Sequence, residues 1–239
     1  TRHLLPLYWH SKRGTAEERT GRDDTGLQSV ESLLGIPLVT TVKMDGSNTM
    51  IVKDPEEPVR ARNGSHAEHE SFDHLKQEYW NRNVYENLPE HLQVFGENMY
   101  AKHSIHYGCE GCCDERNRGP AVDDVFLVFG VFDTRYNIWL SWYETKQVAE
   151  RIGFPTVPTI HDHRDDENQS FGKENNFKRD YTDIAEDVVD GGNEGIVIRS
   201  QYPFHYDQFG QKVGKYVRPN HVQTDEHWSH QNVTRNEIV

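Results

Sequence analysis

The sequence has few cysteines, no long apolar run and a deficit of positive charge, and each shortage excludes a class of protein. Three cysteines among 239 residues are too few, and odd in number, for a secreted disulfide framework. No apolar stretch approaches the length of a membrane span and no signal-like start is present, which predicts a soluble cytoplasmic protein (host cytoplasm, if the source is viral) with no membrane partner. A net charge of −13 argues against a protein that binds polyanions over its whole surface. Nucleic acid, if bound, needs a local basic cleft.

Aromatic residues are plentiful, at 11%, although hydrophobic residues make up only 34% of the chain. This composition suits a β-rich core, and the length suits one substantial domain. Short β-like runs outnumber helical patterns, which predicts an α+β domain with mainly antiparallel sheets. The expected strands are 38–42, 49–52, 59–63, 92–96, 125–132, 195–199 and 213–218; the expected helices are 71–87, 142–152 and 183–189. Residues 1–37 look irregular, and 161–179 look like a polar surface loop.

The stretch K-M-D-G-S-N, residues 43–48, organises the rest of the chain. It lies between two β-like runs, so Lys43 is expected at the edge of a sheet with a turn at Gly46. Most lysines are solvated surface charges, and this match alone is weak. It gains weight from charged residues that begin or end other β-like runs, where side chains converge on one cleft: Arg62, Glu97, Glu194, Lys212, Lys215 and Arg218.

These charges suggest how Lys43 could act as a nucleophile. A free lysine amine has a pKa of about 10.4, so a shift of roughly 3 units, or about 4 kcal/mol, is needed to make it neutral near pH 7. We expect partial burial and the cations Lys215, Lys212 and Arg62 to lower the Lys43 pKa. The same cations suit a triphosphate, and two carboxylates suit a hydrated magnesium ion or ribose hydroxyls.

Six ordered stretches carry a resemblance to a known superfamily: K-M-D-G-S-N, A-R-N-G, F-G-E-N-M-Y, V-F-G-V-F-D, E-G-I-V-I-R and V-G-K-Y-V-R. The series resembles the motifs of the covalent nucleotidyltransferases, which include ATP-dependent DNA ligases, RNA ligases and GTP-dependent capping enzymes. The stretches G-E-N-M-Y-A-K-H-S-I and V-R-P-N-H-V-Q-T-D-E-H-W are similar to a bacterial and phage branch of the ATP-dependent RNA ligases.

The resemblance implies a single adenylyltransferase domain over residues 1–239, with an ATP-grasp-like ligase fold. Two mainly antiparallel sheets flanked by helices would hold the nucleotide between them. The motif-bearing core is expected at about 38–219 and a polar C-terminal tail at 220–239, with no appended oligonucleotide-binding barrel. The expected absence of the barrel favours either a minimal RNA ligase or a ligase that relies on a protein partner for substrate choice.

The implied chemistry has three steps and uses ATP with Mg²⁺ (or Mn²⁺). Lys43 attacks the α-phosphate of ATP to form lysyl-AMP, the AMP moves to an RNA 5′-phosphate, and an RNA 3′-hydroxyl then displaces AMP to seal the strand. Two rivals stay open: a DNA ligase or capping-type guanylyltransferase that uses the same lysine, and a catalytically inactive nucleotide- or RNA-binding protein.

The resemblance also implies roles for individual residues. Lys43 is the nucleophile; Asp45, Gly46 and Asn48 shape its loop; and Arg62 contacts the nucleotide. Glu97 binds the ribose, Phe132 (or Phe129) stacks on adenine, Glu97 and Glu194 hold the metal through water, and Lys215 contacts the α-phosphate.

The chain departs from the family pattern in two places. Lys212 and Lys215 are three residues apart where the family has two lysines one residue apart, and Arg218 is expected to supply the missing charge. Val42 stands where related RNA ligases often have a glutamate.

The cysteine-containing loop allows two interpretations. His106, Cys109, Cys112 and Cys113 have the ligand types of a structural zinc site. Cys112 and Cys113 are adjacent, however, and no second well-spaced pair exists, so reduced structural thiols are the favoured interpretation. His103, in the stretch that resembles RNA ligases, is a further candidate for a position near the RNA.

Overall fold

Two six-stranded sheets form the framework in the part of the chain that this computed structural model describes, which is residues 2–3, 25–26, 31–61, 67–111, 117–163, 177–218 and 233–239. The expected α+β architecture of two mainly antiparallel sheets flanked by helices is confirmed. Within the described residues, no helix is both long and apolar enough to cross a membrane.

The first sheet has the strand order β11-β3-β12-β14-β1-β2. Its central strands pair antiparallel, whereas β1 pairs parallel with both β14 and β2. The strands are β11 (Thr159–Asp162), β3 (Leu38–Lys43), β12 (Gly195–Ser200), β14 (Val213–Val217), β1 (Arg2–His3) and β2 (Thr25–Gly26).

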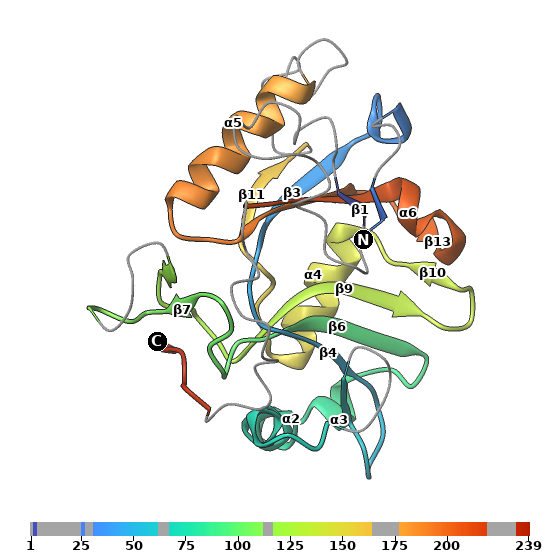
Figure 1. Cartoon of the computed structure of the whole chain (residues 1–239). Helices are drawn as coiled ribbons and strands as arrows, with labels where there is room; N and C mark the ends of the chain where they lie inside the picture. The colour runs from blue at the N-terminus through green and yellow to red at the C-terminus, as the bar shows by residue number, and fades with distance from the viewer. Residues whose placement is uncertain are drawn as a thin grey trace.

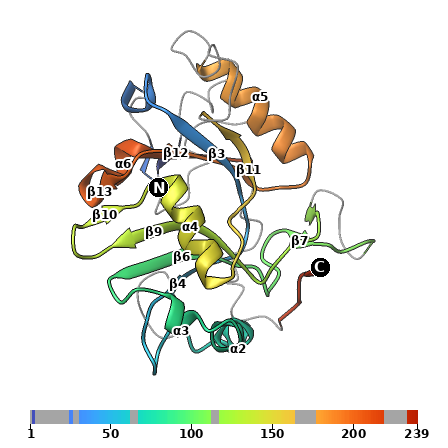
Figure 2. The same ribbon diagram turned by 180° about the vertical axis from the view of Figure 1, so that it is seen from behind.

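The second sheet has the order β13-β10-β9-β6-β4-β5 and is antiparallel throughout. Its strands are β13 (Phe204–His205), β10 (Ile138–Trp139), β9 (Phe126–Asp133), β6 (Leu92–Asn98), β4 (Ser47–Ile51) and β5 (Val59–Ala61). A separate parallel pair, β7 (His106–Tyr107) and β8 (Arg118–Gly119), lies beside the C-terminal segment in both views (Figure 1, Figure 2).

Helices cover the outer faces of the sheets. Figure 1 shows α5 (Phe177–Asp190) along the first sheet at one end of the molecule, with α2 (Asp73–Asn81) and α3 (Val84–Asn87) at the opposite end. The remaining helices are α4 (Trp142–Ile152), α6 (Phe209–Lys212) and the 3₁₀ turns η2 (Glu31–Leu33), η3 (Glu70–Phe72) and η5 (Tyr206–Gln208). A capping box between Ser141 and Glu144 begins α4, and Gly153 ends it with a left-handed conformation (φ 78°), as its sequence predicts.

Three buried clusters fix which face of each sheet points inward. One joins Ile196, Ile198 and Tyr216 to α5, and another joins Ile51, Val94 and other residues of the second sheet to α2 and α4. The third contains Val39 of β3 and Leu127 of β9, so it lies between the sheets. The strand residues of the first two clusters face the helices. Because side chains alternate along a strand, the residues next to them point into the space between the sheets.

A β-bulge interrupts the pairing of β6 with β9. Phe95 pairs with Gly130 but Gly96 pairs with Val128, which leaves Phe129 as an extra residue in β9. The Phe129 carbonyl accepts a hydrogen bond from Arg199 Nη1 of β12 at 3.0 Å. The bulge therefore provides a direct polar link between the two sheets.

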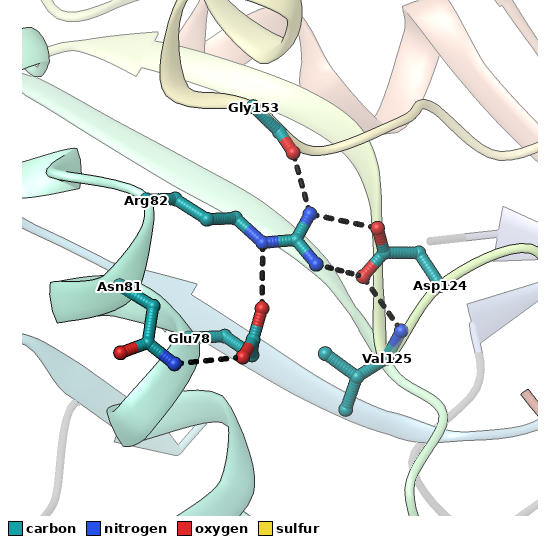
Figure 3. Close-up of polar contacts among 6 residues, drawn as sticks. All are labelled: Glu78, Asn81, Arg82, Asp124, Val125 and Gly153. Atoms are coloured by element: carbon teal, nitrogen blue, oxygen red, sulfur yellow. Dashed lines mark hydrogen bonds and ion pairs between the residues drawn. The ribbon is translucent and has the colours of Figure 1, made fainter.

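Arg82 joins three separate segments beneath the second sheet (Figure 3). Its guanidinium donates to both carboxylate oxygens of Asp124, to Glu78 and to the Gly153 carbonyl, and it lies 4.4 Å from the centre of the Phe154 ring. The network ties the end of α2 to the segment before β9 and to the end of α4.

Four expected segments differ from the structure. Residues 1–37 are not irregular throughout, because they contain β1, β2 and η2. The single helix 71–87 is wrong, because Asn83 adopts a left-handed conformation (φ 53°) that separates α2 from α3. The polar loop 161–179 is also wrong at both ends, where β11 continues to Asp162 and α5 begins at Phe177; its middle lies outside the described residues. Residues 233–239 of the expected polar tail pack against the body, with Asn236 buried and Ala101 paired with Arg235.

Candidate active site

Lys43 is the last residue of β3, and residues 44–46 cross from the first sheet to the second, where β4 begins at Ser47. This is the predicted position at a sheet edge. The crossing places Lys43 beside the ends of two further strands that carry predicted site residues, β12 in the first sheet and β6 in the second.

Lys43 forms an ion pair with Glu194, the residue immediately before β12. The side chains are 21% and 7% exposed, respectively. Gly195 pairs with Lys43 on one side and with Val217 on the other, and a Cβ on this glycine would lie 2.0 Å from the Tyr216 carbonyl oxygen. A glycine is therefore required here, and it lets Glu194 approach Lys43 closely.

The electrostatic environment of Lys43 is dominated by carboxylates. Burial lowers the Lys43 pKa, but the charges of Glu194, Glu97 and Asp45 and the hydrogen bond to Glu194 outweigh burial and raise it to about 12. The expectation that cations lower this pKa is wrong for the protein without bound nucleotide. The reason is that the attraction of three carboxylates for the ammonium outweighs the cost of its burial.

Lys215 lies on the same inner face of the first sheet as Lys43. Thr41, Val197 and Lys215 are register partners across β3, β12 and β14, and this row lies two residues from the row that contains Lys43. Cross-strand partners share a face, so Lys43 and Lys215 both point between the sheets. The structure thus brings together the predicted nucleophile and the predicted α-phosphate ligand.

Glu97 and Asn48 supply the facing side from the second sheet. They are register partners on β6 and β4, and Glu97 also pairs with Leu127, whose side chain belongs to the cluster between the sheets. Asn48 Oδ1 is buried and has no hydrogen-bond partner among the described residues. A buried amide oxygen of this kind calls for a ligand or water that donates a hydrogen bond.

Asp45 is held by backbone amides rather than by a cation. Its Oδ2 accepts a hydrogen bond from the Ile105 amide at 2.7 Å, and its own amide donates to Tyr107 Oη at 3.1 Å. Burial raises the Asp45 pKa, opposed by the charge of Lys43 and by the amides of Ile105 and Ser104. Asp45 therefore shapes the loop around Lys43, as predicted.

Gly46 and Ser47 complete the loop. A Cβ on Gly46 would lie 2.7 Å from the Asn98 carbonyl oxygen, so only glycine fits the crossing. Ser47 Oγ lies 3.0 Å from His103 Nε2, which places His103 next to the nucleophile loop.

Arg218 and Lys212 occupy opposite ends of β14. The Arg218 amide donates to the Glu194 carbonyl at 2.8 Å, and its charge lowers the pKa of Asp45, so Arg218 lies at the Lys43 end. Lys212 ends α6, before Val213, which pairs with Arg199 in the row of Val39, four residues from Lys43 along β3. Of these two cations, the structure brings Arg218 to the site.

The two candidates for adenine stacking lie at different depths between the sheets. Phe132 pairs with Gln93 at the far end of β9, where its ring packs 5.3 Å from Trp139 and 6.0 Å from Tyr206. Phe129 packs against the inter-sheet cluster that also contains Met44, the residue after Lys43. The alternative residue, Phe129, thus lies nearer the nucleophile.

Several predicted residues are less informative. Arg62, Cys112 and Cys113 lie outside the described residues. Cys109 is disulfide-bonded, so the favoured interpretation of reduced thiols is wrong for this residue. His106 Nε2 lies 2.8 Å from the Arg235 carbonyl oxygen. Zinc binding stays a prediction. Val42 is half-buried, and because valine has no carboxylate, the group that the family glutamate supplies is missing at this position.

Sequence reasoning missed Arg199, Tyr107 and Asn236. Arg199 is buried between the sheets, where its guanidinium donates to the carbonyls of Phe129 and Leu140 and burial lowers its pKa to about 10. Arg199 is the last residue of the stretch E-G-I-V-I-R, and a basic residue at the end of a motif-bearing strand is a signal that could have identified it. Tyr107 and Asn236 carried no local pattern.

A cavity of about 630 Å³ opens away from these residues, between α2 and the C-terminal segment. Its lining includes Asp73, His74, Tyr100 and Arg235. It does not include Lys43 or Glu194, so it is separate from the candidate active site.

Comparisons with known proteins give a family and a fold. The RNA ligase family model matches residues 36–217, and no curated protein matches the chain. The Naegleria gruberi RNA ligase with PPi is 17% identical with a TM-score of 0.53, over 80% of this chain and 52% of that one. A lysine-to-alanine mutant of the same ligase with ATP and Mn is 14% identical with a TM-score of 0.52, over 91% of this chain and 59% of that one.

An archaeal ATP-dependent RNA ligase is 16% identical with a TM-score of 0.48, over 80% of this chain and 44% of that one. The chain thus spans about half the length of these solved structures. The family match covers most of the chain and includes the Lys43, Glu97, Glu194 and Lys215 strands. The protein belongs to the RNA ligase family.

Proposed function

We propose that the chain is an ATP-dependent RNA ligase that joins RNA 3′-hydroxyl and 5′-phosphate ends through lysyl-AMP and adenylylated RNA. The observation that carries the proposal is the convergence of Lys43, Glu194 and Lys215 from one sheet with Glu97 and Asn48 from the other. Membership of the RNA ligase family supports the choice of RNA.

The Lys43 ammonium first gives one proton to solvent or to Glu194, and the neutral amine attacks the α-phosphorus of ATP. The N–P bond forms as the bond to pyrophosphate breaks, and a second proton leaves the nitrogen to solvent. Lys215, on the same face, stabilises negative charge on the α-phosphate. The fixed strand positions supply the in-line geometry that this displacement needs. Glu97 and Asn48 bind ribose hydroxyls, since the buried Asn48 Oδ1 lacks a donor among the described residues. Phe129 is the better placed of the two rings for adenine.

A divalent metal fits the charge of the site. The charges of Glu194, Glu97 and Asp45 all act on Lys43, so these carboxylates lie close enough to the nucleophile to share a metal with the phosphates of a bound nucleotide. Among the described residues, no three histidine, cysteine or carboxylate side chains converge closely enough to hold a metal by themselves. We infer that Glu97 and Glu194 hold Mg²⁺ (or Mn²⁺) through water, as is usual for magnesium shared with substrate phosphates. When bound, the metal neutralises charge on the triphosphate.

The test is covalent labelling followed by sealing. The protein is incubated with magnesium and either ATP or GTP labelled at the α-phosphate, denatured and examined for a protein-bound label. Nicked RNA duplex, single-stranded RNA and nicked DNA are then offered with ATP. Label from ATP and sealing of RNA support the proposal; label from GTP indicates a capping-type enzyme, and sealing of DNA alone a DNA ligase. No label from either nucleotide overturns the proposal in favour of a binding protein.

A further inference from the structure

We propose that Tyr107 and Asn236 are positioning residues that hold the nucleophile loop, residues 43–47, and that the C-terminal segment, residues 233–239, acts through them on lysyl-AMP formation. This inference rests on the proposed function. Tyr107 and Asn236 lie outside the two six-stranded sheets that carry the candidate site. The inference gives a role to a segment whose sequence predicts only a polar tail.

The nucleophile loop is gripped at three points by residues 103–107. The Asp45 amide donates to Tyr107 Oη at 3.1 Å, the Ile105 amide donates to Asp45 Oδ2 at 2.7 Å, and Ser47 Oγ lies 3.0 Å from His103 Nε2. Asp45 and Ser47 flank Gly46, so the crossing between the sheets is fixed on both sides. These contacts fix the residues that directly follow Lys43.

Tyr107 has no freedom to move. Its side chain is completely buried, and a Cβ on Gly119 would lie 2.6 Å from its ring, so the ring occupies space that only this glycine leaves open. Burial is the main cause that raises the Tyr107 pKa well above its usual value, and the charge of Asp45 raises it further. The hydroxyl therefore stays neutral and remains a fixed acceptor for the Asp45 amide.

Asn236 holds Tyr107 from the other side. Its Oδ1 accepts from the Tyr107 amide at 3.0 Å, and its Nδ2 donates to the carbonyls of Met99 at 2.8 Å and Ala101 at 3.1 Å. Its own amide donates to the Tyr100 carbonyl at 3.1 Å. One buried side chain thus joins the segment after β6, which carries Glu97, to the residue that holds Asp45.

The rest of the C-terminal segment secures Asn236 in place. The Lys102 amide donates to the Thr234 carbonyl at 2.7 Å, the Glu237 amide donates to the Tyr107 carbonyl at 2.9 Å, and the Val122 amide donates to the Glu237 carbonyl at 3.3 Å. These backbone hydrogen bonds join the C-terminal segment to residues 100–107 and to Val122. The geometry makes the segment a brace for the nucleophile loop rather than a tail.

The primary test compares Tyr107→Phe with Tyr79→Phe. Tyr79 is equally buried, and its Oη donates to the Val52 carbonyl at 3.1 Å, but it lies in the core beneath the second sheet. Single-turnover lysyl-AMP formation and sealing of pre-adenylylated RNA are measured well below the melting temperature. We expect Tyr107→Phe to slow lysyl-AMP formation about tenfold by freeing the Asp45 amide, with the Km for ATP little changed. Tyr79→Phe should leave the rate unchanged.

The second test uses Asn236→Ala, with Thr234→Ala as its control. The Thr234 side chain is exposed, and its backbone carbonyl, which accepts from the Lys102 amide, is kept in the alanine variant. Asn236→Ala should also slow lysyl-AMP formation, and the double variant Asn236→Ala, Tyr107→Phe should lose less than the product of the two single effects, since both act through one chain of contacts.

Each result bears on the inference. Equal rates for Tyr107→Phe and Tyr79→Phe, or multiplicative effects in the double variant, overturn it while lysyl-AMP formation by the unaltered protein keeps the proposed function intact. Absence of lysyl-AMP in the unaltered protein overturns both. A stability role alone would lower both measured steps in proportion, which also contradicts the inference.

Discussion

The Lys43 ammonium and the Glu194 carboxylate form an ion pair where β3 and the start of β12 lie side by side. Because Glu97 and Asp45 add to the effect of Glu194, the amine that should attack ATP is protonated in the free protein, with a pKa of about 12. The pair keeps the nucleophile in place but holds it in its inactive protonation state.

This protonation state predicts the pH dependence of lysyl-AMP formation. The neutral amine is the nucleophile, and below its pKa of about 12 the neutral fraction rises tenfold with each pH unit. At ATP concentrations below Km, the pH dependence of the rate reflects the pKa values of the free protein. Under these conditions the rate should rise steadily between about pH 6 and pH 9. Glu194→Gln removes the largest of the carboxylate charges that raise the pKa, so its rising limb should move to lower pH even if its limiting rate falls. A flat profile for the unaltered protein would contradict the prediction.

The raised pKa has a consequence for stability as well. A lysine whose pKa is higher in the folded than in the unfolded protein stabilises the fold fully below the unfolded value of about 10.5. That contribution disappears as the pH rises through about 12.

Replacement of Lys43 separates the steps of ligation. Lys43→Ala should abolish the covalent nucleotide adduct, because no other side chain replaces the attacking amine, and should leave part of the sealing of pre-adenylylated RNA. Labelled ATP checks the first statement and a pre-adenylylated RNA substrate the second. Loss of both activities would indicate a folding defect or a wider role for the lysine, which thermal unfolding of the variant distinguishes.

Gly195 should tolerate no side chain. An alanine Cβ would lie 2.0 Å from the Tyr216 carbonyl oxygen, in a backbone conformation (φ 156°) that side chains rarely adopt. We expect Gly195→Ala to destabilise the protein by about 3 kcal/mol or more and to separate β12 from β14 beside Glu194.

Gly35→Ala is the matched control. Gly35 also has a positive φ (72°), but among the described residues, its chain neighbours aside, no atom lies within 4 Å of the added Cβ, so about 1 kcal/mol of backbone strain is expected. Chemical denaturation of the two variants measures the difference. Equal losses would mean that conformation, rather than the contact with Tyr216, decides the cost.

Arg82 should be a stability residue without a catalytic role. Arg82→Ala removes two hydrogen bonds to Asp124, one to Glu78, one to the Gly153 carbonyl and the contact with the Phe154 ring, so a loss of about 2 kcal/mol is expected (Figure 3). Lys76→Ala, which breaks an exposed pair with Asp73, should change stability by less than about 0.5 kcal/mol. Thermal unfolding compares the two variants, and lysyl-AMP formation well below the melting temperature should be normal in both.

The Arg82 network also predicts acid sensitivity. Hydrogen bonds from Arg82 and then Asn81 lower the Glu78 pKa. A carboxylate with a lowered folded pKa stabilises the fold above its unfolded value near 4.5, and the contribution is lost as the pH falls through the folded pKa. The difference in stability between the unaltered protein and Arg82→Ala should therefore shrink below about pH 4.

Sequence patterns located the strand ends that carry Lys43, Glu97 and Glu194, because alternation and glycine turns are local signals. They did not determine register, so the row of Thr41, Val197 and Lys215 became visible only in the sheet. The sign of the Lys43 pKa shift was wrong for the same reason: sequence identifies charges near a site, whereas their distances decide which charge dominates.

Non-local contacts were beyond reach. Tyr107 and Asn236 are 129 residues apart, and no spacing within either segment indicates that one holds the other. The preference for Phe129 over Phe132 likewise depends on a bulge, which shifts the alternation of β9 by one residue without leaving a mark in its run of apolar residues.

That bulge decides how β9 would respond to the loss of one residue. Leu127 and Val131 are four residues apart, whereas their partners Glu97 and Val94 are three apart, which is why Leu127 and Phe132 both point inward although five positions separate them. Deleting Phe129 would make the two spacings equal, so both halves of the strand would keep their partners and their faces. The protein would lose the Phe129 ring and the carbonyl that accepts from Arg199. The extra residue therefore serves the space between the sheets rather than the pairing of the strands.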